Sequence, residues 1–188
     1  MGGSTMSGVL AGLGMATLLG WVAFAILGWV VSPPLSVWIG GAIGGLLVLV
    51  ARNTMILRGF VALLAPFGVM LPAIALRQMA AELGAPVVPF ATFEILVFLL
   101  LYVAFLVSAI GVVPVDVYRV GYAPLPVAAM VLSVCVYGYL TGNWFLPLVA
   151  VLGQALWLSR WGSSNWFDHV THVLLVPVAL IVLVVRVI

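Results

Sequence analysis

The sequence carries very little charge. Its 188 residues include six arginines, four acidic residues and no lysine. Only 5% of the residues are therefore charged, whereas a soluble domain has roughly 25%. A water-facing surface cannot be built from so few charges, and a net charge of +2 is too small and too scattered for nucleic acid. These numbers exclude a soluble globular protein and a nucleic-acid-binding protein.

Cysteine and enzyme motifs are scarce as well. Cys135 is the only cysteine, so an internal disulfide is impossible, and we expect this side chain to pack as a small hydrophobe. The sequence contains no P-loop, GxSxG, HExxH or CxxC pattern and no paired carboxylates. It implies no particular cofactor, and it favours a non-enzymatic role.

What the sequence does contain is long apolar runs. Hydrophobic residues make up 66% of the chain, and the mean hydropathy is +1.42. The runs are continuous and do not alternate with period two, which favours membrane helices over a membrane barrel. We therefore predict an all-α, polytopic membrane helical bundle that forms a single domain over residues 1–188 and has no soluble domain.

Seven apolar segments qualify as spans, given that a crossing needs roughly 20 residues. Two of them, 127–141 and 144–159, are short, so the number of crossings lies between five and seven. Residues 77–90 are expected to form an interfacial turn of helix followed by an extended, proline-rich loop. The seven predicted spans are 7–31, 35–51, 59–76, 91–113, 127–141, 144–159 and 165–188.

Small residues recur every four positions in the first two predicted spans. A short link containing Pro33 and Pro34 joins these spans, which suggests an antiparallel hairpin packed through the small residues. Such stripes are also typical of homodimer contacts and partner-binding faces. They comprise Gly8, Gly12, Ala16 and Gly20 in the first span, and the two overlapping GxxxG patterns Gly40–Gly44 and Gly41–Gly45 in the second.

The third predicted span contains Pro66 and Pro72, and proline removes an internal hydrogen bond from a helix. This pattern predicts either a plain kink or a broken helix that lines a transport path.

Arginine placement predicts the orientation in the membrane. With seven spans, four arginines fall on the side of the N-terminus and two on the other side. The positive-inside rule then puts the N-terminus in the cytoplasm, and we expect a bacterial inner membrane. The four are Arg52, Arg58, Arg119 and Arg160, and the two are Arg77 and Arg186.

The last predicted span opens with four polar residues, Asn165, Asp168, His169 and His172. On one continuous helix they would share a face. In the first interpretation Asn165 is the N-cap, Asp168 at the third helical position completes a capping box, and the histidines lie at the interface near two tryptophans. The alternatives are a site that handles a proton or ligand, and a metal or haem ligand.

Glu94 is the other candidate site residue, because an ionisable group inside a span suggests function by default. Its position close to the start of the span also allows it simply to reach the headgroups.

Three functions follow from these features. The first is a non-catalytic membrane subunit that anchors or stabilises a larger membrane complex. The second is a small oligomeric transporter or channel in which the kinked third span and Glu94 line the path. The third is an electron-transfer or metal-dependent membrane subunit that uses His169 and His172. The expected partners are membrane lipids together with other membrane subunits or further copies of the chain.

Overall fold

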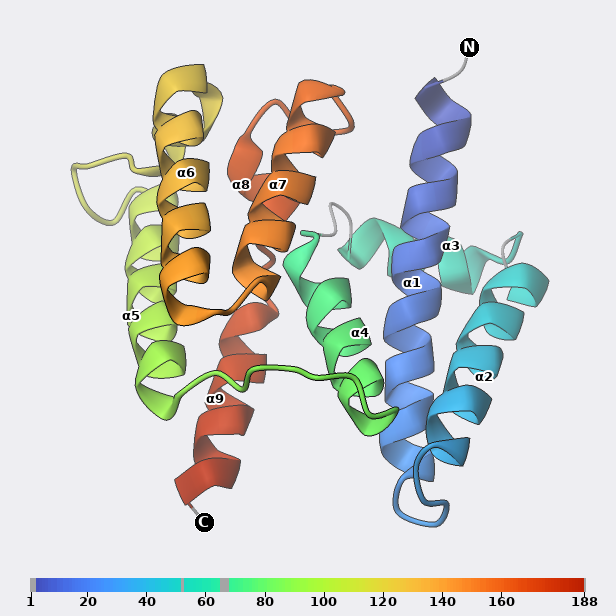
Figure 1. The fold of residues 1–188 in the computed structure, drawn as a ribbon. Coiled ribbons are helices and arrows are strands. Elements are labelled where there is room, and N and C mark those ends of the chain that lie inside the picture. Colours follow the sequence, from blue (N-terminus) through green and yellow to red (C-terminus); the bar gives the residue numbers. More distant parts are fainter. Residues whose placement is uncertain (1–2, 52, 65–67, 188) are drawn as a thin grey trace. The chain divides into compact units, whose positions relative to one another are not determined.

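The computed structural model describes residues 3–51, 53–64 and 68–187. Within these ranges all regular elements are helical, which confirms the all-helical prediction (Figure 1). The α-helices are α1 (Gly3–Leu27), α2 (Leu35–Ala51), α3 (Met55–Leu64), α4 (Met70–Glu82), α5 (Thr92–Ala109), α6 (Pro124–Thr141), α7 (Phe145–Leu158), α8 (Trp166–Val170) and α9 (Leu175–Val187), and η1 (Tyr118–Tyr122) is a 3-10 helix.

Three helices of the described chain are long and apolar enough to cross a membrane. They are Gly8–Leu27 within α1, all of α5 and all of α6. A fourth span results if α2 and α3, which meet at a bend of 116°, are counted as one broken crossing. The helices α7 and α9 are apolar but have only 14 and 13 residues. The arrangement with seven crossings stays a prediction.

Contacts between the helices divide the chain into two compact units, residues 1–87 and 88–188. The helices α1 to α4 form the first unit, and α5 to α9 together with η1 form the second. The division falls in a segment without regular structure, residues 85–91, where the sequence predicts an extended proline-rich loop.

In the first unit α1 and α2 form the predicted antiparallel hairpin (Figure 1). A Cβ atom on Gly44 would lie 2.3 Å from the carbonyl oxygen of Ala16 and 2.4 Å from the amide nitrogen of Gly20. A Cβ atom on Gly40 would lie 2.7 Å from the amide nitrogen of Phe24. Because a side chain needs more room than this, only glycine at these positions lets the two backbones touch.

Only one of the two predicted GxxxG patterns makes this close contact. A Cβ atom on Gly45 would meet nothing within 4 Å, and one on Gly41 would meet only the terminal methyl group of Met79, at 3.8 Å. A Cβ atom on Gly8, at the start of the stripe in α1, would also meet nothing within 4 Å. The close contact is therefore made by the face of α2 that carries Gly40 and Gly44, and Gly41 and Gly45 lie off this face.

The described residues of the predicted third span, 59–76, belong to two helices, which agrees with the broken-helix alternative and not with a plain kink. The helix α3 ends at Leu64 and α4 begins at Met70. Pro66, one of the two predicted kink residues, lies outside the described residues. Pro72 lies in the first turn of α4, where the missing N–H has no helical partner to lose.

The helix α4 continues beyond the predicted end of the third span. It runs six residues past Leu76, to Glu82, and so includes the predicted interfacial turn. On this extension the side chain of Gln78 accepts a hydrogen bond of 2.8 Å from the indole nitrogen of Trp21. This bond ties α4 to α1.

In the second unit the chain runs in alternating directions through α5, α6, α7 and α9 (Figure 1). A Cβ atom on Gly138 would lie 2.2 Å from Pro147, so α6 and α7 pack closely. A Cβ atom on Gly153 would lie 2.3 Å from Val170, so α7 and α8 do as well. Because α6 and α7 are antiparallel neighbours, the segment before α6 and the loop after α7 lie at the same end of this unit.

Residues 165–187 contain two helices, α8 and α9, and the prediction of one continuous helix is wrong. After α8 the backbone of Thr171 is extended, with φ −106° and ψ 158°. The helix α9 begins only at Leu175. His172 lies in the break, so it does not share a helical face with Asp168 as an unbroken helix would require.

Three described helices, α4, α5 and α7, end in the same Schellman motif. The residue after the C-cap donates its backbone N–H to the carbonyl three residues back, and the next residue donates to the carbonyl five residues back. The first of these residues is left-handed: Gly84 (φ 87°), Gly111 (φ 76°) and Arg160 (φ 54°). A left-handed residue with a Cβ atom costs about 1–2 kcal/mol, so the end of α7 is strained where the other two are not.

Candidate functional site

Five polar residues, which we call the carboxylate cluster, join η1 to the loop before α8. They are Tyr118, Ser163, Asn165, Asp168 and His169. The side-chain oxygen of Asn165 accepts the backbone N–H of Phe167 at 2.9 Å, which confirms the prediction that Asn165 is the N-cap of α8. Its side-chain nitrogen donates to the carbonyl oxygen of Tyr118 at 2.8 Å. One buried amide thus starts α8 and holds η1 in place.

Gly121 makes the close approach of η1 and α8 possible. A Cβ atom on this glycine would lie 2.1 Å from the side-chain oxygen of Asn165 and 2.7 Å from the ring of Phe167. Any side chain at this position would displace the N-cap.

Asp168 accepts hydrogen bonds from two hydroxyl groups. The Tyr118 hydroxyl lies 2.9 and 2.8 Å from its two carboxylate oxygens, and the Ser163 hydroxyl lies 2.5 Å from Oδ2. Ser163 Oγ also accepts the backbone N–H of Asn165 at 3.0 Å. The predicted capping box is therefore wrong in its second half, because the serine and not Asp168 receives this N–H.

The Tyr118 hydroxyl stays protonated over a wide pH range. Burial raises the pKa of this phenol above its ordinary value, and the hydrogen bond to Asp168 and the negative charge of that carboxylate raise it further. Its ring also packs among aromatic neighbours, Phe105, Tyr122 and Phe167. The phenol is thus a fixed donor to the carboxylate.

His169 lies inside the protein, with 1% of its surface exposed. Its expected position at the membrane interface stays a prediction, and its ring lies near Trp161 as expected, with 6.4 Å between the centroids. Its Nε2 lies 2.9 Å from the carbonyl oxygen of Ser163. Because a carbonyl only accepts, Nε2 carries the proton.

His172 is placed differently. It lies in the break before α9, where its Nδ1 accepts the backbone N–H of Leu174 at 3.2 Å. A ring nitrogen that accepts is unprotonated, so the histidine supplies an acceptor to the backbone just before α9 begins.

Glu94 lies at the opposite end of α5 from η1. Its Oε2 accepts the backbone N–H of Ala91 at 2.6 Å, which caps α5. Its Oε1 accepts a hydrogen bond from the hydroxyl of Tyr137 on α6. Near it, the Arg186 guanidinium donates to the carbonyl oxygen of Phe90 at 2.8 Å and ties the end of α9 to the segment before α5.

The structure brings together three of the five predicted site residues. Asn165, Asp168 and His169 belong to the carboxylate cluster, while His172 and Glu94 lie elsewhere in the second unit. Whether any of them has a functional role stays a prediction. Among the described residues, no group of three or more His, Cys, Asp or Glu is placed to hold a metal ion.

Sequence reasoning missed two members of the cluster, Tyr118 and Ser163. Tyr118 lies in a loop that also contains Asp116 and Arg119, a mixture typical of a membrane interface. Ser163 lies two residues before the N-cap, in a segment rich in small polar residues. Nothing in the sequence indicates that these two hydroxyls meet one carboxylate.

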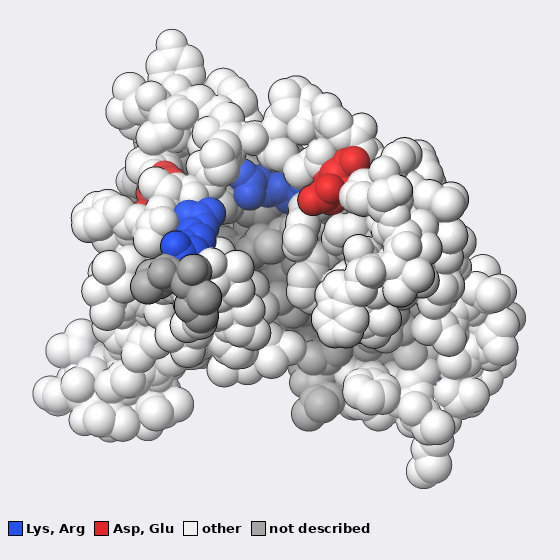
Figure 2. Space-filling view, turned by 90° about the horizontal axis from the view of Figure 1, so that it is seen from below, with Lys and Arg blue, Asp and Glu red and all other residues white. Residues whose placement is uncertain are grey.

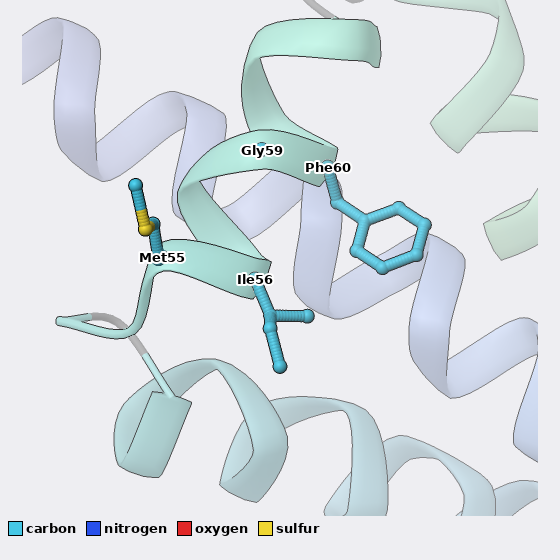
Figure 3. Close-up of a pocket in the computed structure, with 4 residues that line it drawn as sticks. All are labelled: Met55, Ile56, Gly59 and Phe60. Atoms are coloured by element: carbon cyan, nitrogen blue, oxygen red, sulfur yellow. The ribbon is translucent and has the colours of Figure 1, made fainter.

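A second feature, in the first unit, is an apolar pocket on α3 (Figure 3). It is lined by Met55, Ile56, Gly59 and Phe60. The opposite side of α3 packs into the unit through Leu57, which is buried against Met15. The pocket therefore presents hydrocarbon outward, which suits contact with lipid chains.

The groups of the carboxylate cluster can fix the backbone of η1 and α8, and they can donate or accept protons. In the structure they make hydrogen bonds to one another and to this backbone. Comparison with family models, curated proteins and solved structures finds no match to this chain.

Proposed function

We propose that the chain is a non-catalytic integral membrane subunit that anchors or stabilises a larger membrane protein complex. The supporting observation is that the candidate site residues hold structural elements in place. Asp168 links α8 to η1, Glu94 links α5 to α6, and His172 supplies an acceptor near the start of α9. The polar atoms of these side chains make hydrogen bonds to other groups of the fold, as residues that hold a structure together do.

The uncovered helix surfaces support the same proposal. In the most apolar windows of α1, α5 and α6, only 17%, 17% and 11% of the residues are buried within the protein. On the face seen in Figure 2, charged side chains cover only a few small areas. Such surface is suited to lipids and to neighbouring membrane subunits or further copies of the chain.

For the arrangement in the membrane we propose seven crossings. They comprise α1, α2, the broken pair α3 and α4, α5, α6, α7, and the broken pair α8 and α9, with the N-terminus in the cytoplasm of a bacterial cell. The alternation of α6, α7 and α9 in Figure 1 supports this, because the start of α6 and the end of α7 lie at one end of the second unit and the end of α9 lies at the other. Arg119 and Arg160 adjoin the first two helix ends, and Arg186 lies at the third. Reporter fusions after Ala51 and Gly142 should then lie on opposite sides, and the same side for both would contradict seven crossings.

Purification from the native membrane tests the subunit function. After extraction in a mild detergent, size exclusion and mass spectrometry should find a second membrane protein in constant ratio to this chain. A species that contains only this chain, as a monomer or homo-oligomer, would contradict the proposal.

One observation favours a transporter as the second candidate. The break between α8 and α9 leaves Thr171 with an extended backbone, at φ −106° and ψ 158°. Transporters use broken helices of this kind around their sites. In proteoliposomes with a pH-sensitive dye inside, this function predicts a voltage-driven proton flux that Asp168→Asn abolishes. The subunit function predicts no flux from either protein.

A further inference from the structure

Arg160 occupies a backbone position that glycine occupies in the two equivalent helix ends. All three ends have the same pair of backbone hydrogen bonds, and only α7 places a side chain on the left-handed residue. Glycine would avoid the strain at this left-handed position, so an arginine there suggests that its side chain has a function. We propose that Arg160 binds the phosphate of an anionic phospholipid headgroup.

The loop holds Arg160 rigidly. The Trp157 indole, before Arg160, donates a hydrogen bond of 2.8 Å to the carbonyl oxygen of Ser164, after it. His169 Nε2 donates a second hydrogen bond to the carbonyl oxygen of Ser163. The side chain of Arg160 itself is exposed, and within the described residues its guanidinium has no hydrogen bond or ion pair. The backbone is thus fixed where the exposed guanidinium is available to an anion such as a phosphate.

The surroundings of Arg160 point to a lipid as the source of the phosphate. The residue directly follows the apolar helix α7, and it lies between Trp157 and Trp161 in sequence. Tryptophan is enriched at the level of the headgroups, where an arginine near a helix end meets lipid phosphates.

A second exposed arginine lies at the same end of the unit. Arg119 belongs to η1, and the carboxylate cluster ties η1 to the loop that follows α7. Only the backbone of Arg119 is engaged by Asp116, at 3.1 Å. Asp116 and Asp168 lie at this end as well, so the four formal charges cancel. Both carboxylates accept hydrogen bonds from neighbouring groups, whereas the guanidinium of Arg160 has no such partner within the described residues. Its own positive charge favours a lipid of net negative charge over a zwitterionic one.

The experiment measures the unfolding temperature of the purified chain in a neutral detergent, with added phosphatidylglycerol, phosphatidylcholine or inorganic phosphate. Phosphatidylglycerol should raise the unfolding temperature of the wild type, and the other two should not. Arg160→Gly should unfold at a higher temperature than the wild type without lipid, because glycine relieves the left-handed strain. It should also need about fivefold more phosphatidylglycerol, the factor for one charge at an anionic surface.

Two further variants make the result decisive. Arg160→Asn keeps a residue that tolerates the left-handed region, and it should show the same loss of lipid response. Arg58→Gln removes one exposed arginine from α3, where the backbone is helical, and it should weaken the response less than the Arg160 variants do. An undiminished response in both Arg160 variants would overturn the proposal, and so would an equal response of the wild type to inorganic phosphate. The proposal needs insertion in a membrane but no partner subunit, so it can fail independently of the proposed function.

Discussion

The Tyr118 hydroxyl donates a hydrogen bond that both carboxylate oxygens of Asp168 share, at 2.9 and 2.8 Å. The two residues are 50 positions apart, and the bond joins the segment between α5 and α6 to the segment between α7 and α9. Ser163 adds a hydroxyl from the loop before α8. This single carboxylate therefore holds one end of the second unit together, and its replacement should lower the free energy of unfolding.

We expect Asp168→Asn to destabilise the protein by about 1–3 kcal/mol, because hydrogen bonds to a charged group contribute about that much. The asparagine oxygen accepts one hydroxyl, and its amide group opposes the other. Thermal unfolding in detergent measures the loss. Asp116→Asn is the matched control, since that exposed carboxylate accepts only one backbone N–H. Equal effects of the two variants would contradict the structural role of Asp168.

The raised pKa of Tyr118 predicts how stability depends on pH. In the unfolded chain the phenol has a pKa of about 10, and in the folded protein the pKa is higher. Below pH ~10 both states keep the proton, and the stabilisation is complete. Between the two pKa values the unfolded state loses a proton that the folded state keeps, so the stabilisation decreases and disappears as pH rises through the folded pKa. The difference in unfolding temperature between the wild type and Tyr118→Phe should therefore shrink above pH ~10. A constant difference up to pH ~12 would show that the phenol does not titrate with unfolding.

The two histidines should respond differently to replacement by glutamine. His169 is buried against Trp161, so His169→Gln should cost about 1–3 kcal/mol, as do other changes in a packed interior. His172 is partly exposed, and its bond to Leu174 is a cap-like contact, so His172→Gln should cost about 1 kcal/mol or less. Thermal unfolding again gives these values. A variant that stays folded but loses a measured function would identify its histidine as a functional residue.

Much of the fold could be predicted from the sequence because it depends on local composition. Apolar runs and their proline or glycine boundaries give the helices, and the small residues of α1 and α2 give their hairpin. Pro66 and Pro72 already indicated a kink or a broken helix in the segment 59–76. The break in the last helix was not predictable in this way, because Thr171 interrupts it without any glycine or proline beside it.

Within the candidate site, only contacts between residues close together in the sequence could be predicted. The N-cap role of Asn165 follows from its place just before a helix, and the structure confirms it. The partners of Asp168 depend on which loops meet in space. Tyr118 is 50 residues away, so no spacing rule connects it to this carboxylate.

Glu94 offers a test that separates a cap from a functional carboxylate. Its bond to the N–H of Ala91 needs only an oxygen acceptor, which glutamine also supplies. In Glu94→Gln the amide group faces the Tyr137 hydroxyl, which can accept as well as donate a hydrogen bond, so the unfolding temperature should stay near that of the wild type. Glu94→Ala removes the cap and should lose about 1 kcal/mol. If Glu94→Gln stays fully stable but no longer supports the growth or assembly that the native protein supports, the charge itself is required and capping is not its main role.

The hairpin of the first unit gives the last prediction, in which neighbouring glycines serve as each other's controls. A methyl group on Gly44 would lie 2.3 Å from a backbone oxygen of α1, where nothing can move aside without separating the helices. Gly44→Ala should therefore cost about 1–3 kcal/mol, as overpacking does. Gly45→Ala adds the same methyl group where nothing lies within 4 Å, and it should be neutral or slightly stabilising, because alanine favours the helix. Unfolding temperatures in detergent compare the two variants, and an equal loss in both would place the contact between α1 and α2 on a different face of α2.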